Sequence, residues 1–185
     1  ISTGGPKALA TILPEFPANL PAAIVIVQHM PPGFTGSLAA RLNELCQLKV
    51  KEAEDGDELK AGYAYIAPGN YHLTFKSKGE KTFVVLDQSP AVGGFRPNAD
   101  VMMTSLAQSD NKNIIGVIMT GMGSDGSKGL MELKKKKNAY IVAQDESSSI
   151  VFGMPRSAIE LGIVDKTVPL KEIPACIMNF MGVRY

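Results

Sequence analysis

Continuous apolar runs alternate along the chain with segments whose apolar residues are three or four positions apart. This alternation predicts strands separated by helices. Uncharged apolar runs are typical of strands buried on both faces of a parallel sheet, and they occupy residues 22–28, 63–67, 114–120 and 140–143. Apolar residues spaced three or four apart predict helices between these runs. The predicted helices cover residues 7–13 (stopped by Pro14), 35–45 (capped by Thr35), a segment opened by Arg96-Pro97-Asn98, 127–137, a short segment from Pro155, and 171–181.

Residues 71–87 have a different pattern, in which apolar and polar positions alternate one by one. Tyr71, Leu73 and Phe75 share one face, and Lys78-Gly79-Glu80 separates two such runs. This pattern predicts a β-hairpin with strands at 71–77 and 81–87. With strands and helices alternating on both sides of it, we expect one α/β domain over residues 1–185. Its architecture should be three-layered: a mostly parallel sheet, helices on both faces and a hairpin insert.

Charge and composition narrow the class of protein. Nineteen Lys and Arg against 18 Asp and Glu give a net charge of +1, which argues against a dedicated nucleic-acid binder. No apolar run approaches the ~20 residues of a membrane span. Cys46 and Cys176 lie far apart and form no CxxC motif, so reduced thiols in a cytoplasmic protein are the simplest interpretation, without a metal site.

Three polar residues are predicted at the carboxyl edge of the sheet, where α/β proteins bind their ligands. Ser2 precedes a helix, His29 ends a strand, and Asp125 lies in a loop after another strand. A serine becomes a nucleophile when a neighbouring imidazole removes its proton, and a carboxylate can orient that imidazole. The N–H groups at a helix start can hold an oxyanion. The residues therefore suggest a serine hydrolase, with the chain order Ser, His, Asp.

Other interpretations of these residues remain open. Ser-Thr-Gly-Gly at 2–5 could be a simple cap and loop, and His72 is expected to support a loop. Residues 121–126 satisfy GxGxxG, and Asp145 and Glu146 follow at the distance of a ribose-binding acid, so a dinucleotide-binding module is the main alternative. Asp125 weighs against it, because a carboxylate would face the pyrophosphate. A catalytically idle interaction domain is a third alternative. Lys134–Lys137 should end a helix in solvent.

Six ordered segments resemble the catalytic domain of the chemotaxis receptor methylesterases, the CheB family. They span nearly the whole chain: STGGP at 2–6, QHMPPGFT at 28–35, Ala67-Pro68-Gly69 with His72, Arg96-Pro97 with Asp100, TGMGSDG at 120–126, and VFGMPR at 151–156.

The resemblance implies a cytoplasmic protein-glutamate methylesterase that also deamidates selected glutamines of chemotaxis receptors. It implies a catalytic triad of Ser2, His29 and Asp125, and a site lined by Thr3 and Met122. The Met122 N–H would help to hold the oxyanion, and no metal or organic cofactor would be needed. The expected partners are the cytoplasmic helices of receptors. Family members usually carry an N-terminal phospho-accepting receiver domain over the site, and nothing in residues 1–185 matches it. Neither nucleic acid nor membrane insertion is expected.

Overall fold

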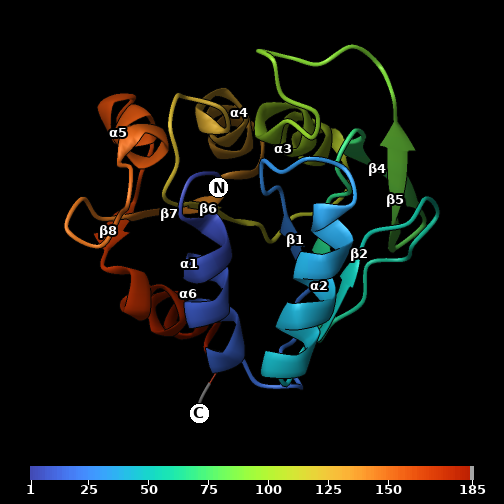
Figure 1. Ribbon diagram of the computed structural model, residues 1–185, viewed down its shortest axis with the longest axis horizontal. Coiled ribbons are helices and arrows are strands. Elements are labelled where there is room, and N and C mark those ends of the chain that lie inside the picture. Colours follow the sequence, from blue (N-terminus) through green and yellow to red (C-terminus); the bar gives the residue numbers. More distant parts are fainter. Residues whose placement is uncertain (184–185) are drawn as a thin grey trace.

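Helices cover both faces of a layer of strands in the computed structural model, which describes residues 1–183 (Figure 1). Helices α1, α2 and α6 lie on one side, and α3, α4 and α5 lie on the other. The helices are α1 Gly5–Ile12, α2 Phe34–Leu45, α3 Ala99–Gln108, α4 Ser127–Lys137, α5 Gly153–Glu160 and α6 Ile173–Met181. The strands are β1 Ile24–Ile26, β2 Lys49–Glu52, β3 Tyr63–Ile66, β4 His72–Lys78, β5 Lys81–Asp87, β6 Ile115–Ile118, β7 Tyr140–Gln144 and β8 Lys166–Val168.

The predicted three-layer α/β fold with a hairpin insert is confirmed. Strands β1, β3 and β2 form one parallel sheet, and β6, β7 and β8 form another. Strands β4 and β5 pair antiparallel around Gly79. Of the six predicted helices, the one over 127–137 has the predicted bounds, and the others differ at their ends by a few residues.

The backbone of Ile1 and Ser2 lies between the two parallel sheets. The Ile1 nitrogen donates to the Val27 carbonyl at 3.1 Å, and the His29 N–H donates to the Ile1 carbonyl at 3.1 Å. On the other side, the Ser2 N–H donates to the Thr120 carbonyl at 2.9 Å. Backbone bonds of this kind hold neighbouring strands together. Ser2 is therefore fixed between the end of β1 and the end of β6.

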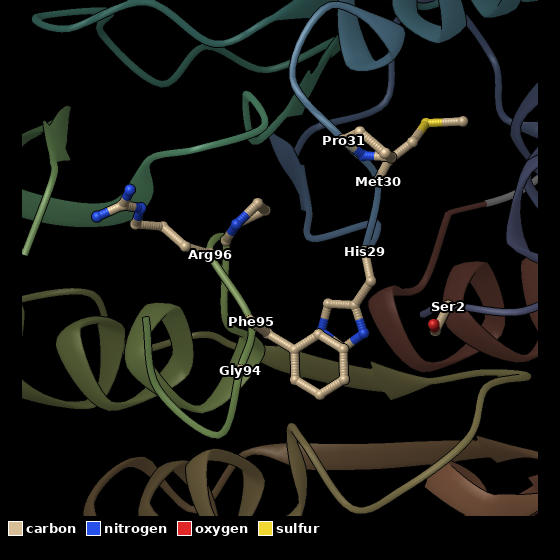
Figure 2. A pocket seen from close by; sticks show the side chains of 8 residues that line it. Ser2, His29, Met30, Pro31, Gly94, Phe95 and Arg96 are labelled. Atoms are coloured by element: carbon tan, nitrogen blue, oxygen red, sulfur yellow. The ribbon is translucent and has the colours of Figure 1, made fainter. Parts of the chain in front are cut away.

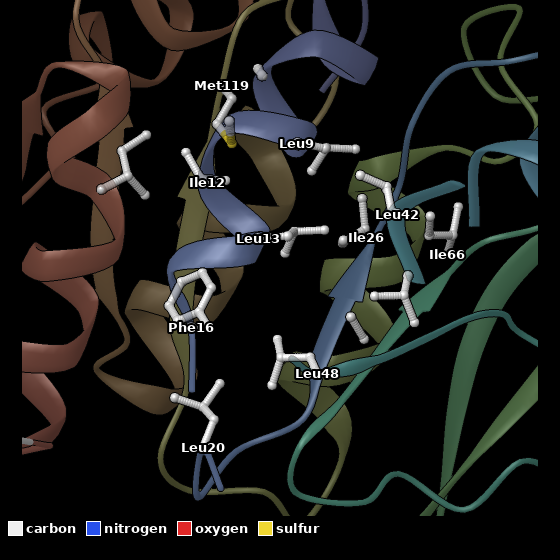
Figure 3. Close-up of a cluster of buried hydrophobic side chains, with 14 of the residues drawn as sticks. Leu9, Ile12, Leu13, Phe16, Leu20, Ile26, Leu42, Leu48, Ile66 and Met119 are labelled. Carbon is white, nitrogen blue, oxygen red and sulfur yellow. The ribbon is translucent and has the colours of Figure 1, made fainter. Parts of the chain in front are cut away.

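Two hydrophobic clusters, one on each face of the strands, form the core. In the first, Leu9 and Ile12 of α1 lie in one cluster with Leu42 of α2 and Ile26 of β1 (Figure 3). The second joins α3, α4 and α5 to the opposite face; its fully buried members include Leu73, Leu130, Ile141 and Met154. Close packing on both faces keeps the strands rigid, so the loops at their carboxyl ends start from fixed positions.

The structure corrects the predicted start of α2. Thr35 does not cap this helix; its N-cap is Gly33, which has φ 86° and no side-chain hydrogen bond. The Thr35 hydroxyl is buried, accepts the Gly69 N–H at 3.0 Å and donates to Glu52. A buried hydroxyl takes the partners that its surroundings offer, and here these come from β2 and from the loop after β3.

Two further predictions need correction, and two strands were not predicted at all. Leu13–Glu15 continue α1 as a 3₁₀ turn that includes Pro14, so proline ends the α-helix without ending the helical path. Sequence periodicity missed β2 and β8, which are four and three residues long. The lysines that end α4 are only partly solvated, because Lys134 pairs with Asp165 and Lys137 donates to the Ser109 carbonyl.

Candidate active site

A cavity of about 360 Å³ opens at the carboxyl edge of the strands. The segment before α1, the segment after β1 and the loop between β5 and α3 enclose it (Figure 2). Its lining residues are Ser2, His29, Met30, Pro31, Gly94, Phe95, Arg96 and Pro97. The structure therefore brings Ser2 and His29 to one cavity, although the sequence between them includes all of α1.

His29 and Asp125 form a short, buried hydrogen bond. His29 Nε2 lies 2.6 Å from Asp125 Oδ2, and the two side chains are 6% and 5% exposed. Asp125 also accepts the Ala99 N–H at 2.7 Å and the Asp100 N–H at 2.9 Å. Burial acts to raise the pKa of Asp125, but these hydrogen bonds outweigh it and the pKa is lowered. Asp125 is therefore a carboxylate at neutral pH, able to orient the imidazole.

The second nitrogen of His29 remains free for chemistry. Nδ1 is buried and has no hydrogen-bond partner within residues 1–183. Figure 2 shows Ser2 on one side of the imidazole and Arg96 on the other. Within the described chain the Ser2 hydroxyl forms no hydrogen bond with His29, so only one of the two expected triad contacts is made. Catalytic hydrogen bonds are often long without substrate and shorten when it binds.

Backbone contacts hold Ser2 in place. Its carbonyl accepts the Gly5 N–H at 2.8 Å and Gln28 Nε2 at 3.0 Å. The chain at Gly121 passes so close that a Cβ there would lie 2.9 Å from the Ser2 Cβ and 2.3 Å from the Met154 sulfur. Such contacts do not occur between real side chains, so only glycine fits at this position.

Thr3 follows Ser2 in the chain, and Met122 follows Gly121, which packs against Ser2. Both are exposed, Met122 to 69%, and neither side chain is among those that line the cavity. Their backbone N–H groups donate no hydrogen bond to any residue from 1 to 183. Two uncommitted N–H groups beside a serine are what an oxyanion site requires. The role of Thr3 and Met122 stays a prediction.

Phe95 is a site residue that sequence reasoning missed. Its ring stacks on His29 with centroids 4.0 Å apart and planes 10° from parallel. The only local signals were Gly93-Gly94, which form a tight turn with φ 57° and 84°, and the adjoining Arg96-Pro97 motif. A stack of this kind limits the rotation of the imidazole and keeps water from one of its faces.

The loop that carries Phe95 is anchored at several points. The Arg96 guanidinium donates to the Gln88 and Ser89 carbonyls at 2.8 and 2.9 Å and also reaches Asn70. His72 is fully buried, and its Nε2 lies 3.1 Å from the Pro90 carbonyl. This contact confirms the expectation that His72 supports a loop.

The geometry weighs against the dinucleotide alternative. The Asp125 carboxylate in this loop is bound to His29 and to the start of α3. The N–H groups of Gly126 and Gly129, which a pyrophosphate would need, are bound to the Asp100 carboxylate. Asp145, the expected ribose ligand, accepts hydrogen bonds from Ser147 and Ser148 of its own turn.

Comparison with known proteins identifies the family. The family model described as CheB methylesterase matches residues 1–177. The chain belongs to the CheB methylesterase family. It is 50% identical over 178 residues to the protein-glutamate methylesterase/protein-glutamine glutaminase of Pyrococcus abyssi, covering 96% of this chain and 48% of the relative. The Geobacillus kaustophilus protein of the same name is 51% identical over 181 residues, with coverage of 98% and 52%.

A solved structure supports the same assignment. The crystal structure of the Thermotoga maritima CheB methylesterase catalytic domain superposes with a TM-score of 0.93 at 46% identity. The match covers 97% of this chain and 94% of that domain. The chain spans about half the length of the curated CheB relatives it matches.

Among residues 1–183, no three His, Cys, Asp or Glu side chains form a group that could hold a metal ion. No helix in the same range is long and apolar enough to cross a membrane.

Proposed function

We propose that this chain hydrolyses the γ-methyl esters of glutamate side chains on chemotaxis receptors and deamidates selected glutamines. Ser2 would be the nucleophile, His29 the base and Asp125 the acid that orients it. The observation that carries the proposal is the buried contact between His29 Nε2 and Asp125, with Ser2 in the same cavity. The names of CheB relatives at about 50% identity support the substrate class.

The chemistry follows from the free nitrogen of His29. Nδ1 removes the Ser2 proton as the hydroxyl attacks the γ-carbonyl. The tetrahedral oxyanion is held by backbone N–H groups, for which Thr3 and Met122 are the candidates. The imidazolium, stabilised by Asp125, then protonates the departing methanol. Water activated by the same imidazole hydrolyses the acyl-enzyme to glutamate. A glutamine side chain would follow the same path and release ammonia.

The proposed substrate sets the partners and the compartment. The resemblance to the family suggests that the target glutamates lie on cytoplasmic helices of receptors, so the reaction would take place in the cytoplasm. The curated relatives are about twice as long as this chain. The resemblance to the family suggests a phospho-accepting receiver domain as the regulator that would cover the cavity.

The deciding experiment measures methanol release from methylated receptor helices. Ser2→Ala and His29→Ala should each lower kcat to a similar floor, by about 10⁴-fold or more, because nucleophile and base act as a unit. Ser147→Ala is the matched control, since Ser147 is exposed and lies outside the cavity; it should keep wild-type turnover. Near-native methanol release by Ser2→Ala would rule out covalent catalysis at this residue.

A further inference from the structure

Asp125 caps a helix other than its own. It lies just before α4, yet its two carboxylate oxygens accept the N–H groups of Ala99 and Asp100, the first two residues of α3. Asn98 accepts the third N–H of that turn, from Val101, at 2.9 Å. The positive end of the α3 dipole therefore points at Asp125 and favours its negative charge.

Asp100 returns the contact from α3 to α4. Its Oδ1 accepts the Gly126 N–H at 2.9 Å and the Gly129 N–H at 2.7 Å, which belong to the N-cap and first turn of α4. Asp125 thus accepts N–H groups at the start of α3, and Asp100 accepts N–H groups at the start of α4. These N–H groups have no carbonyl partner within their own helix. The two carboxylates form a reciprocal pair of caps, one of which also holds His29.

The close approach of the two helices makes this exchange possible. A Cβ on Gly129 would lie 2.6 Å from the Met103 Cβ and 3.0 Å from the Asp100 Cα. Gly129 therefore lets the backbones of α3 and α4 come within reach of a short aspartate side chain. Burial and the nearby charge of Asp125 raise the pKa of Asp100, although the Gly129 and Gly126 N–H groups oppose this rise. Two neighbouring carboxylates are kept here despite their repulsion.

We propose that Asp100 is a positioning residue for the reaction, acting through Asp125. Asp100 fixes the backbone from Gly126 to Gly129. It thereby holds Asp125, the residue just before that segment, at hydrogen-bonding distance from His29. It touches neither substrate nor the reacting atoms. The inference rests on the proposed function, because it assigns a role within that same site.

The experiment compares two variants of the same residue. Asp100→Ala removes both acceptor contacts and should let Asp125 move slightly. Because small displacements of catalytic groups slow the chemical step, kcat per folded molecule should fall by roughly 10- to 100-fold, with KM nearly unchanged. Asp100→Asn keeps an oxygen that can accept both N–H groups and should stay within about threefold of wild type. Asp165→Ala is the matched control. Asp165 also accepts a backbone N–H, from Ile141 at 2.7 Å, but has no contact with the site.

A second readout does not depend on turnover. The short His29–Asp125 hydrogen bond should give a downfield imidazole proton resonance, which Asp100→Ala should shift or broaden while Asp100→Asn and Asp165→Ala leave it in place. Wild-type kcat in folded Asp100→Ala, or equal loss in Asp100→Asn and Asp100→Ala, would overturn the inference. An unchanged resonance in Asp100→Ala would also overturn it. A failure of the proposed function itself would be seen separately, as methanol release that persists in Ser2→Ala.

Discussion

At the scale of single residues, the neighbours of His29 together leave one of its two ring nitrogens free for chemistry. Asp125 occupies Nε2, and Phe95 covers one face of the ring. Nδ1 is then the nitrogen left on the side of Ser2. A histidine held on two sides retains its tautomer and its direction, which is what a general base requires.

Asp125 should make stability depend on pH in a definite direction. Its pKa is lowered in the folded protein, so its contribution is present above the unfolded value of about 3.9 and is lost as pH falls through the folded value. Asp125→Asn should lower the free energy of unfolding at pH 7 by about 1–3 kcal/mol, because an amide cannot accept from all three donors.

Urea denaturation of both proteins between pH 7 and pH 3 tests this prediction. The gap between wild type and Asp125→Asn should narrow below about pH 4, because the unfolded wild type then takes up a proton at Asp125 that the folded protein does not. A gap that stays constant over this range would contradict the assigned charge state of Asp125.

At the scale of elements, the pairing of α3 with α4 determines where Asp125 lies. Gly129→Ala should destabilise the protein by about 1–3 kcal/mol, because the new methyl meets Met103 and the backbone of Asp100. Helix propensity alone would favour alanine by about 1 kcal/mol. Activity should fall as well, because the added methyl group pushes apart the two helices that position Asp125.

Gly36 in α2 provides the matched control for that substitution. A Cβ there would lie 3.2 Å from the carboxylate end of Glu52, which is the tip of a flexible side chain. Gly36→Ala should therefore change the free energy of unfolding by less than about 1 kcal/mol. Thermal melts of both variants measure the difference. Equal effects at the two glycines would mean that the α3–α4 contact is not tight.

At the scale of the whole molecule, two large apolar side chains are exposed in the segments that follow the carboxyl ends of β1 and β7. Phe34 is 61% exposed and Ile150 is 66% exposed. Phe34 begins α2, five residues after His29, and Ile150 packs on Gly4 beside Ser2. Apolar side chains left exposed near a cavity are typical of a surface that binds another protein. In the proposed function, the receptor helix would lie here.

Ile150→Ser tests the use of this surface. It should lower kcat/KM for methylated receptor helices by roughly tenfold and leave turnover of free glutamate γ-methyl ester unchanged, because remote contacts position the γ-carbonyl only in the protein substrate. Leu45→Ser is the control, since Leu45 is also exposed but lies at the far end of α2. An equal loss on both esters would place Ile150 in the chemistry itself.

The sequence by itself determined the order of most strands and helices, the hairpin and the polar residues at the carboxyl edge. These features depend on local periodicity and on glycine and proline, which act within a few residues. Strands β2 and β8 were too short to show a period.

Only the tertiary structure decided which distant residues meet. The stack of Phe95 on His29, the exchange of caps between Asp100 and Asp125, and the contact of Thr35 with Gly69 each join segments far apart along the chain. No local pattern encodes such contacts, because they depend on how closely packed layers bring separate loops to one edge of the sheet.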